Sequence, residues 1–192
     1  MAMTEVLPLN VVPLPVRLRA ADYMLLDETG AFQPYGKTEL LDGEIVYMNA
    51  QHRPHGRVKM ALYRALSEGL RAIGSAYSVA VEVSVALSEH DAPEPDLTLT
   101  SEPDGDGFIP ARSVGLIVEI ADATLRSDMT RKAAIYARAG IPEYWVADVN
   151  GRVIHQMWHP LAGAYADRRT ISFGDRLNSA TISGLVVQTT GL

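Results

Sequence analysis

The sequence has 192 residues, of which 47% are hydrophobic and none is cysteine. A chain of this length can bury roughly 70% of the surface that its unfolded form exposes, so it needs no disulfide or structural metal to fold. The absence of cysteine excludes a disulfide scaffold and thiolate zinc sites, and it fits a reducing, cytoplasmic compartment. The 17 basic and 23 acidic residues give a net charge of −6, which argues against a protein that coats nucleic acid.

We expect residues 1–18 to form an N-terminal arm and residues 19–192 to form a single domain. Three prolines interrupt the arm and no basic residue precedes its apolar patches, so a signal peptide is not expected. No apolar run approaches the ~20 residues of a membrane span, so a membrane partner is not expected either.

Helix and strand patterns alternate along the domain. Apolar spacing predicts a short helix over residues 19–28 and a long amphipathic helix over 54–73. Two short strand patterns around an Asp-Gly turn predict a hairpin over 39–48. Alternating apolar residues predict one half-buried strand over 77–87.

The second half of the domain continues the mixed pattern. A continuous apolar run over 114–121 is typical of a central strand that is covered on both faces. A helix is predicted from Asp128, as its N-cap, to Ala139. Further strands are expected at 96–100, 143–149 and 152–158 and within 164–187.

Glu119 is the most informative single residue, because it interrupts the apolar run at 114–121. An unpaired carboxylate buried there would cost several kcal/mol. Glu119 must therefore be protonated, paired or bound to a cation, and a purely structural ion pair stays open as an interpretation.

Asp96 and Lys132 can complete a site around Glu119. Asp96 opens its strand just after Pro95, where it is either an ordinary turn acid or a second carboxylate near Glu119. Mg²⁺ typically takes one or two carboxylates together with substrate phosphate. Lys132 lies one turn after Asp128, so it either forms a surface pair with Asp128 or turns toward Glu119 to orient water or stabilise charge.

These residues resemble the motif of the PD-(D/E)XK superfamily, with Pro95-Asp96 as its first part and Glu119 as its acid. More narrowly, residues 19–187 are similar to the Uma-type family of restriction-endonuclease-like proteins. The matching segments occur in this order: Glu39 to Ile45, His55-Gly56, Pro95 to Leu97, Val118 to Ile120, Asp128 with Lys132 and Tyr136, and Ala139 to Asp148.

The resemblance implies a restriction-endonuclease-like α/β fold with a mixed central sheet flanked by helices. The superfamily lysine expected two residues after the acid is Ala121 here, and its position in the Uma-type family makes Lys132 the candidate. The resemblance also places Glu44 and His55 near the site, Glu44 as a further carboxylate and His55 as a contact to phosphate or a ligand. The residues alone would make Glu44 a strand-surface acid and His55 a helix-start residue.

The expected function is hydrolysis of DNA phosphodiester bonds with Mg²⁺ or Mn²⁺. Asp96 and Glu119 would bind the metal, Lys132 would assist attack by water, and Glu44 and His55 would help. Two alternatives stay open: a non-catalytic binding or assembly module, which the acidic net charge favours, and a hydrolase of a small phosphorylated substrate. A homodimer would suit the cutting of two strands.

Overall fold

The computed structural model describes residues 14–48 and 50–192. Most of the expected N-terminal arm, residues 1–13, lies outside the described residues, and residues 14–18 form neither helix nor strand. The first half of the chain contains α1 (Ala20–Glu28), η1 (Gln33–Tyr35), β1 (Thr38–Leu41), β2 (Glu44–Tyr47), α2 (Arg53–Ala72), β3 (Ser78–Val81), β4 (Val85–Ala86) and β5 (Leu97–Thr100).

The second half begins with short elements and ends in strands. It contains β6 (Ile109–Pro110), η2 (Ala111–Ser113), β7 (Val114–Ala121), α3 (Leu125–Ser127), η3 (Asp128–Lys132), α4 (Ala133–Arg138), β8 (Glu143–Asp148), β9 (Val153–Leu161), β10 (Ala164–Ser172), β11 (Arg176–Asn178) and β12 (Val186–Gln188). No helix among the described residues is long and apolar enough to cross a membrane.

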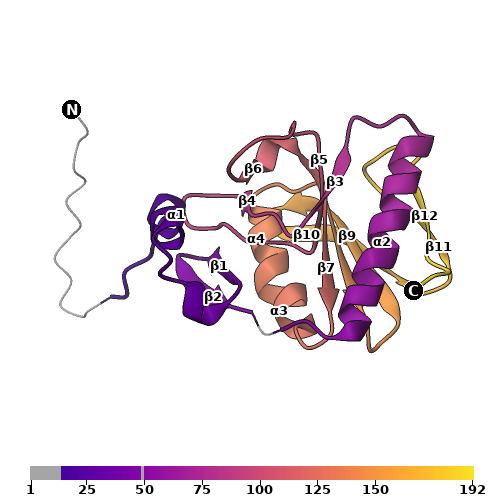
Figure 1. The fold of residues 1–192 in the computed structure, drawn as a ribbon. Coiled ribbons are helices and arrows are strands. Elements are labelled where there is room, and N and C mark those ends of the chain that lie inside the picture. The colour runs from indigo at the N-terminus through magenta and orange to yellow at the C-terminus, as the bar shows by residue number, and fades with distance from the viewer. Residues whose placement is uncertain (1–13, 49) are drawn as a thin grey trace.

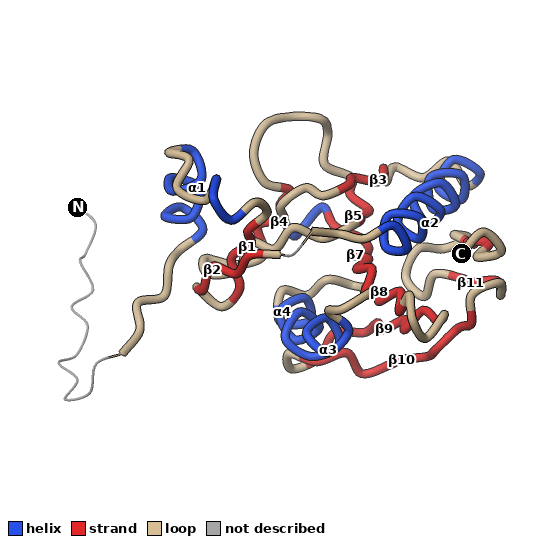
Figure 2. Tube along the Cα trace, turned by 60° about the horizontal axis from the view of Figure 1, so that its bottom comes forward, coloured by secondary structure: helices blue, strands red, loops and turns tan. Residues whose placement is uncertain are grey.

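A six-stranded mixed sheet forms the centre of the molecule, in the order β10-β9-β8-β7-β5-β3. Only β7 and β8 pair in parallel within it, and the other neighbours are antiparallel. Helix α2 covers one face of the sheet and the continuous helix made of α3, η3 and α4 covers the other (Figures 1 and 2). This architecture confirms the predicted mixed α/β fold.

Strand β7 is buried along its whole length, as its apolar sequence predicts. Leu116, Val118 and Ile120 pack into the core beneath α2. Ile117 and Ala121 pack into the second core, beneath α4. Because side chains alternate along a strand, Glu119 lies on the α4 side, and it faces the helix that carries Lys132.

The predicted hairpin is confirmed by the antiparallel pairing of β1 with β2. Asp42 and Gly43 have φ angles of 50° and 77°, the two positive values that a type I′ turn requires. Leu40 exchanges backbone hydrogen bonds of 3.2 and 2.8 Å with Ala92, shortly before β5. This bridge holds the hairpin beside the edge of the central sheet and brings Glu39 with it.

The predicted strand over 77–87 is wrong in one respect, because it divides into two short strands. Glu82 adopts a φ of 53°, which ends the extended backbone after β3. Strand β3 then pairs with β5, whereas β4 pairs with β6 in a separate two-stranded sheet. The alternating apolar pattern continues through Glu82, so the pattern alone could not reveal the break between the two strands.

The predicted start of the second long helix is also wrong. The helix begins at Leu125, with Thr124 in the N-cap position, so Asp128 is not its N-cap. Residues Asp128–Lys132 instead form a π-helical turn within the helix. Such turns widen the helix by one residue and often occur at functional sites. Here the turn buries both Asp128 and Lys132.

Candidate active site

A cavity of about 340 Å³ opens at the edge of the sheet where β7 ends and β5 begins. Its walls come from the β1–β2 hairpin, the first turn of α2, the segment after β7, and η3. Four predicted site residues line this cavity: His55, Asp96, Glu119 and Lys132. Glu44 is not among the lining residues.

Glu119 is only 5% exposed and stands between the sheet and η3. Its Oε1 atom accepts hydrogen bonds from Lys132 Nζ at 3.0 Å and from the Tyr136 hydroxyl at 2.6 Å. Among the described residues, no protein group donates to its Oε2 atom. One oxygen of this buried carboxylate is therefore available to a bound species in the cavity.

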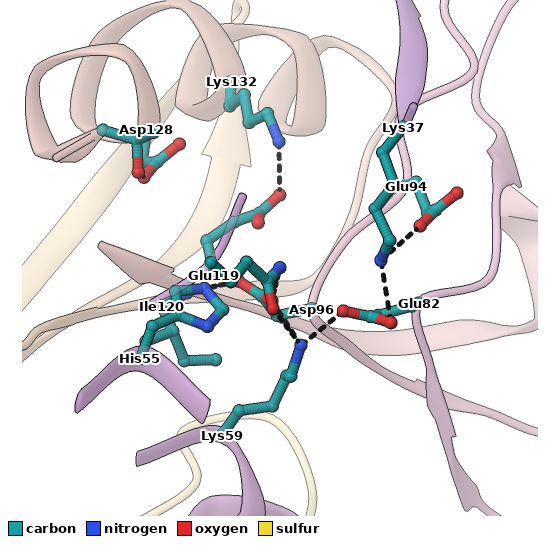
Figure 3. Close-up of polar contacts among 12 residues, drawn as sticks. Lys37, His55, Lys59, Glu82, Glu94, Asp96, Glu119, Ile120, Asp128 and Lys132 are labelled. Atoms are coloured by element: carbon teal, nitrogen blue, oxygen red, sulfur yellow. Dashed lines mark hydrogen bonds and ion pairs between the residues drawn. The ribbon is translucent and has the colours of Figure 1, made fainter. Parts of the chain in front are cut away.

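Lys132 joins two buried carboxylates. In addition to Glu119, its ammonium contacts Glu39 Oε2 at 3.0 Å. Burial lowers the pKa of Lys132, but the charges of Glu119, Glu39 and Asp128 outweigh that effect and hold the pKa above its usual value. Lys132 is therefore a fixed positive charge in the wall of the cavity (Figure 3).

Asp96 is held by donors from three segments. Its Oδ2 atom accepts from the Ile120 backbone N–H at 2.9 Å and lies 3.2 Å from His55 Nε2. Its Oδ1 atom lies 3.3 Å from Gln51 Nε2 and 3.4 Å from Lys59 Nζ. Burial raises the pKa of Asp96, but the hydrogen bond from His55 and the other donors outweigh burial, so the pKa is lowered overall.

His55 lies in the first turn of α2 and is 6% exposed. Its Nε2 atom faces Asp96, whereas its Nδ1 atom is buried without a hydrogen-bond partner in the described part of the chain. Burying an unpaired ring nitrogen costs free energy. This cost is not explained if His55 serves only as a residue at the start of a helix. The structure thus brings His55 into the site beside Asp96.

The structure places Glu44 outside the site. Its side chain is 69% exposed and pairs with Arg131 at 2.8 Å. It stands directly after the hairpin turn, opposite Leu41, where the turn directs it to the surface. The hairpin carboxylate that reaches the cavity is Glu39, which is 3% exposed.

Three further residues of the site were not predicted: Glu39, Gln51 and Lys59. Lys59 follows His55 by four residues, so the two share a helical face, and this spacing could have identified it. Glu39 is next to Leu40 in β1, so an alternating strand pattern would leave it on the exposed face. Nothing in the sequence indicated that Glu39 is buried. Figure 3 shows Lys59 and Lys132 reaching Asp96 and Glu119 from different helices.

A second set of ion pairs lies in the same cavity. Glu82 pairs with Lys59 and, at 2.7 Å, with Lys37, which also contacts Glu94 at 3.1 Å. Burial raises the pKa of Glu82, but its two lysine partners lower it to about 2. The residue that breaks the predicted strand is therefore an ionised member of the cavity wall.

Negative charge predominates in the cavity, since seven carboxylates line it against three Lys or Arg side chains. Burial raises the pKa of Glu119 to about 8, opposed by Lys132 and reinforced by the charges of Asp128, Asp96 and Glu39. Burial likewise raises the pKa of Asp128. Such excess charge is relieved either by protons or by a cation.

The available donors fit a hard divalent cation. Carboxylate oxygens are the preferred ligands of Mg²⁺, which keeps several waters and needs only one or two carboxylates. In the described part of the chain no three His, Asp or Glu side chains converge closely enough to enclose a metal by themselves. Glu119 Oε2 offers one such oxygen without a donor among the described residues, and Asp96 lines the same cavity.

A family comparison gives a match over most of the chain. Residues 20–190 match the family described as "Uma2: Putative restriction endonuclease". The chain belongs to the Uma2 family. This confirms the resemblance to the Uma-type family that the sequence motifs indicated.

A solved structure similar to that of this Uma2 chain is described as "a putative nuclease belonging to DUF820", from Anabaena variabilis ATCC 29413. The two share 12% sequence identity with a TM-score of 0.64, over 84% of this chain and 89% of that one. At this identity the likeness shows the fold, which is restriction-endonuclease-like. A search of curated proteins found no match.

Proposed function

We propose that this Uma2 protein is a nuclease that hydrolyses DNA phosphodiester bonds with Mg²⁺ or Mn²⁺ in the cavity beside β7. Membership of a family described as "Putative restriction endonuclease" supports the reaction class. The observation that carries the proposal is Glu119, a buried acid with one oxygen free in an acidic cavity and the other bound by Lys132.

Asp96 and Glu119 are the proposed metal-binding residues. When bound there, a divalent ion would supply an activated water and would neutralise charge on the phosphate. The Ile120 N–H and His55 fix the Asp96 carboxylate in place through its Oδ2 atom. A carboxylate that is already oriented loses little freedom when it binds an ion, so these donors make it a better ligand.

Lys132 is proposed to favour the ionised form of Glu119 against the effect of burial, and to stabilise negative charge on the reacting phosphate. Its ammonium is fixed by two carboxylates and cannot move far, which suits a preorganised electrostatic role. Tyr136 donates to the same oxygen and thereby orients Glu119 toward the cavity. Both residues come from the helix that contains the π-helical turn.

Lys59 is a second cation beside the proposed metal-binding residue Asp96, on the α2 side. It lies 3.4 Å from Asp96 Oδ1 and is also bound by Gln51 at 2.6 Å. We propose that His55 and Gln51 act as positioning residues for Asp96 and Lys59. Because Glu44 lies outside the cavity, it has no role in this proposal.

The size of the cavity also favours a second candidate, hydrolysis of a small phosphodiester. At about 340 Å³ the cavity is at the lower end of the range for small-molecule sites. Such an enzyme would use the same residues in the same roles but would leave plasmid DNA intact. The two candidates therefore differ in substrate and share one chemistry.

Nicking of supercoiled plasmid in Mn²⁺ or Mg²⁺ tests the proposal. We expect nicking that EDTA abolishes, and we expect Glu119→Gln and Lys132→Met each to lower the rate by about 100-fold or more. Glu68→Gln is the matched control, because Glu68 is an exposed acid outside the cavity. Wild-type nicking that persists in EDTA, or full activity in folded Glu119→Gln, would contradict the proposal. Turnover of bis(p-nitrophenyl) phosphate without nicking would favour the second candidate.

A further inference from the structure

Two exposed tyrosines stand together at the cavity. Tyr47, the last residue of β2, lines the cavity and is 65% exposed. Its ring centroid lies 6.2 Å from that of Tyr35, which is 58% exposed, and the two planes are tilted by 38°. The other six tyrosines are buried or half-buried. Neither hydroxyl of the exposed pair forms a hydrogen bond within the described part of the chain.

This pair has no evident structural purpose. Aromatic rings contribute most to stability when they are buried, and these two leave more than half of their surface in water. Exposed tyrosines are typical of binding surfaces, where a flat ring provides contact area at little cost in conformational entropy. Their position beside the acidic cavity connects them to its substrate.

We propose that Tyr35 and Tyr47 form a base-stacking platform for single-stranded DNA, which places one phosphate of the strand in the cavity. This inference rests on the proposed nuclease function and assigns its substrate class. Bases stack on aromatic side chains without regard to sequence, because every base has a π-face. The platform therefore selects an unpaired strand rather than a particular sequence.

The depth of the site favours an unpaired strand over a duplex. Asp96, Glu119 and Lys132 are each no more than 7% exposed, so a reacting phosphate must enter the cavity to reach them. A nucleotide in a duplex would first have to leave the stack, which costs a few kcal/mol and is least costly in a single strand. A single strand can bend into the cavity while its neighbouring bases stay on the tyrosines.

The distribution of charge points the same way. A duplex carries one negative charge per ≈1.7 Å, about twice the density of one strand, so a chain of net charge −6 repels it more strongly. Lys37 and Arg131 line the cavity but are paired with acids. The other basic groups nearby are His52, which lines the cavity, and the exposed Arg53 and Arg57, which follow it on α2. The N-terminal end of the α2 dipole adds partial positive charge there.

Equilibrium binding of fluorescent oligonucleotides tests this inference. The probes are oligothymidylate, the same strand annealed to oligoadenylate, and an abasic strand of equal length and charge. Ca²⁺ replaces Mg²⁺ as the hard cation, and gels check that the probes stay intact. We expect oligothymidylate to bind wild-type protein more tightly than either other probe. Tyr47→Ala should weaken oligothymidylate binding about 5- to 150-fold, the range for loss of one base–aromatic stack.

Matched variants separate stacking from other losses. Tyr47→Phe keeps the aromatic ring and should bind oligothymidylate as tightly as wild type. Leu161→Ala is the control for loss of an exposed apolar side chain, because Leu161 is 64% exposed and lies outside the cavity lining; it should also bind as wild type. Tyr47→Ala should also remove the preference for the thymidylate strand over the abasic one. Equal or tighter duplex binding, or equal binding of the abasic strand by wild-type protein, would overturn the inference. The nuclease proposal is tested separately by hydrolysis assays. It fails if the protein hydrolyses neither bis(p-nitrophenyl) phosphate nor DNA in the presence of a divalent metal.

Discussion

At Glu119, burial and a neighbouring cation act in opposite directions on one carboxyl group. Burial favours the protonated form, whereas Lys132 at 3.0 Å favours the ionised form. Tyr136 donates to the same oxygen and fixes the side chain. The surrounding β7 residues are apolar, so the stability of this segment depends on keeping the charged groups paired.

Removal of Lys132 should therefore destabilise the fold strongly. We predict that Lys132→Met lowers the free energy of unfolding by about 3–5 kcal/mol, the cost of leaving a buried charge without its partner. Urea denaturation at neutral pH measures this change. The double variant Lys132→Met with Glu119→Gln should recover part of the loss, since it removes one of the two buried carboxyl groups that Lys132 contacts. Equal stability of the single and double variants would contradict this coupling.

Glu82 gives a prediction for the dependence of stability on pH. Two lysines lower its pKa from the usual 4.5 to about 2, although burial opposes them. The folded protein thus binds this proton less tightly than the unfolded chain does. The carboxylate stabilises the fold fully above pH 4.5, and this contribution is lost as the pH falls from 4.5 toward 2.

Comparison of wild type with Glu82→Gln tests this sign. The variant should be less stable at neutral pH, and the difference in unfolding free energy should shrink steadily in acid. Denaturation in urea over a series of pH values measures the difference. Glu68→Gln, which changes an exposed acid without an ion-pair partner among the described residues, should show no such trend. If the stability difference between wild type and Glu82→Gln grew in acid, the ionised Glu82 carboxylate would not be stabilising the fold, which would contradict the prediction.

Among the elements, those with strong local patterns could be predicted from the sequence. The β1–β2 hairpin, α2 and β7 occur where the Asp-Gly turn, the amphipathic spacing and the apolar run place them. The break at Glu82 and the π-helical turn at 128–132 could not be predicted. Both depend on contacts with distant residues, such as Lys37 for Glu82 and Glu119 for Lys132, and no local pattern records these contacts.

The same distinction applies to the candidate site. Asp96, Glu119, His55 and Lys132 come together as the motifs indicated. Glu39 was missed because the sequence does not distinguish a buried acid of the hairpin from an exposed one. The difference becomes clear only when the bridge between Leu40 and Ala92 is known. For the same reason Glu44 was expected near the site, although it faces solvent.

Glu143 illustrates how an element outside the cavity is held in place. This fully buried carboxylate has no cationic partner among the described residues. It accepts hydrogen bonds from two neighbours in the sheet and from the segment after β11: Trp145 Nε1, Gln156 Nε2, Ser179 Oγ, the N–H groups of Ala180 and Thr181, and Thr181 Oγ1. The C-terminal strands β11 and β12 are thereby attached to β8.

Neutralising this acceptor should loosen the C-terminal segment. We predict that Glu143→Gln lowers the free energy of unfolding by at least about 2 kcal/mol, the scale of hydrogen bonds to a charged group. Hydrogen exchange should show faster exchange at Ala180 and Thr181, with little change at Ile120 beside Asp96. Unchanged protection at Ala180 and Thr181 would contradict the role assigned to Glu143.

At the scale of the whole molecule, the acidic cavity should make stability depend on divalent cations. A ligand that binds only the folded state adds about 2.7 kcal/mol at 100 times its dissociation constant. We predict that Mn²⁺ raises the melting temperature of wild type but not of Glu119→Gln. Thermal unfolding in Mn²⁺ and in NaCl of equal ionic strength measures this, and an equal rise in both salts would show general screening instead of binding.

The central claim is that the cavity between β7, α2 and η3 is a metal site. Anomalous diffraction from crystals soaked in Mn²⁺ tests this claim most directly, because it locates the ion without assuming any activity. We predict a peak in contact with carboxylate oxygens of Asp96 and Glu119, and its loss in Glu119→Gln. Saturated crystals with no peak in this cavity, or with a peak that survives in Glu119→Gln, would contradict the account.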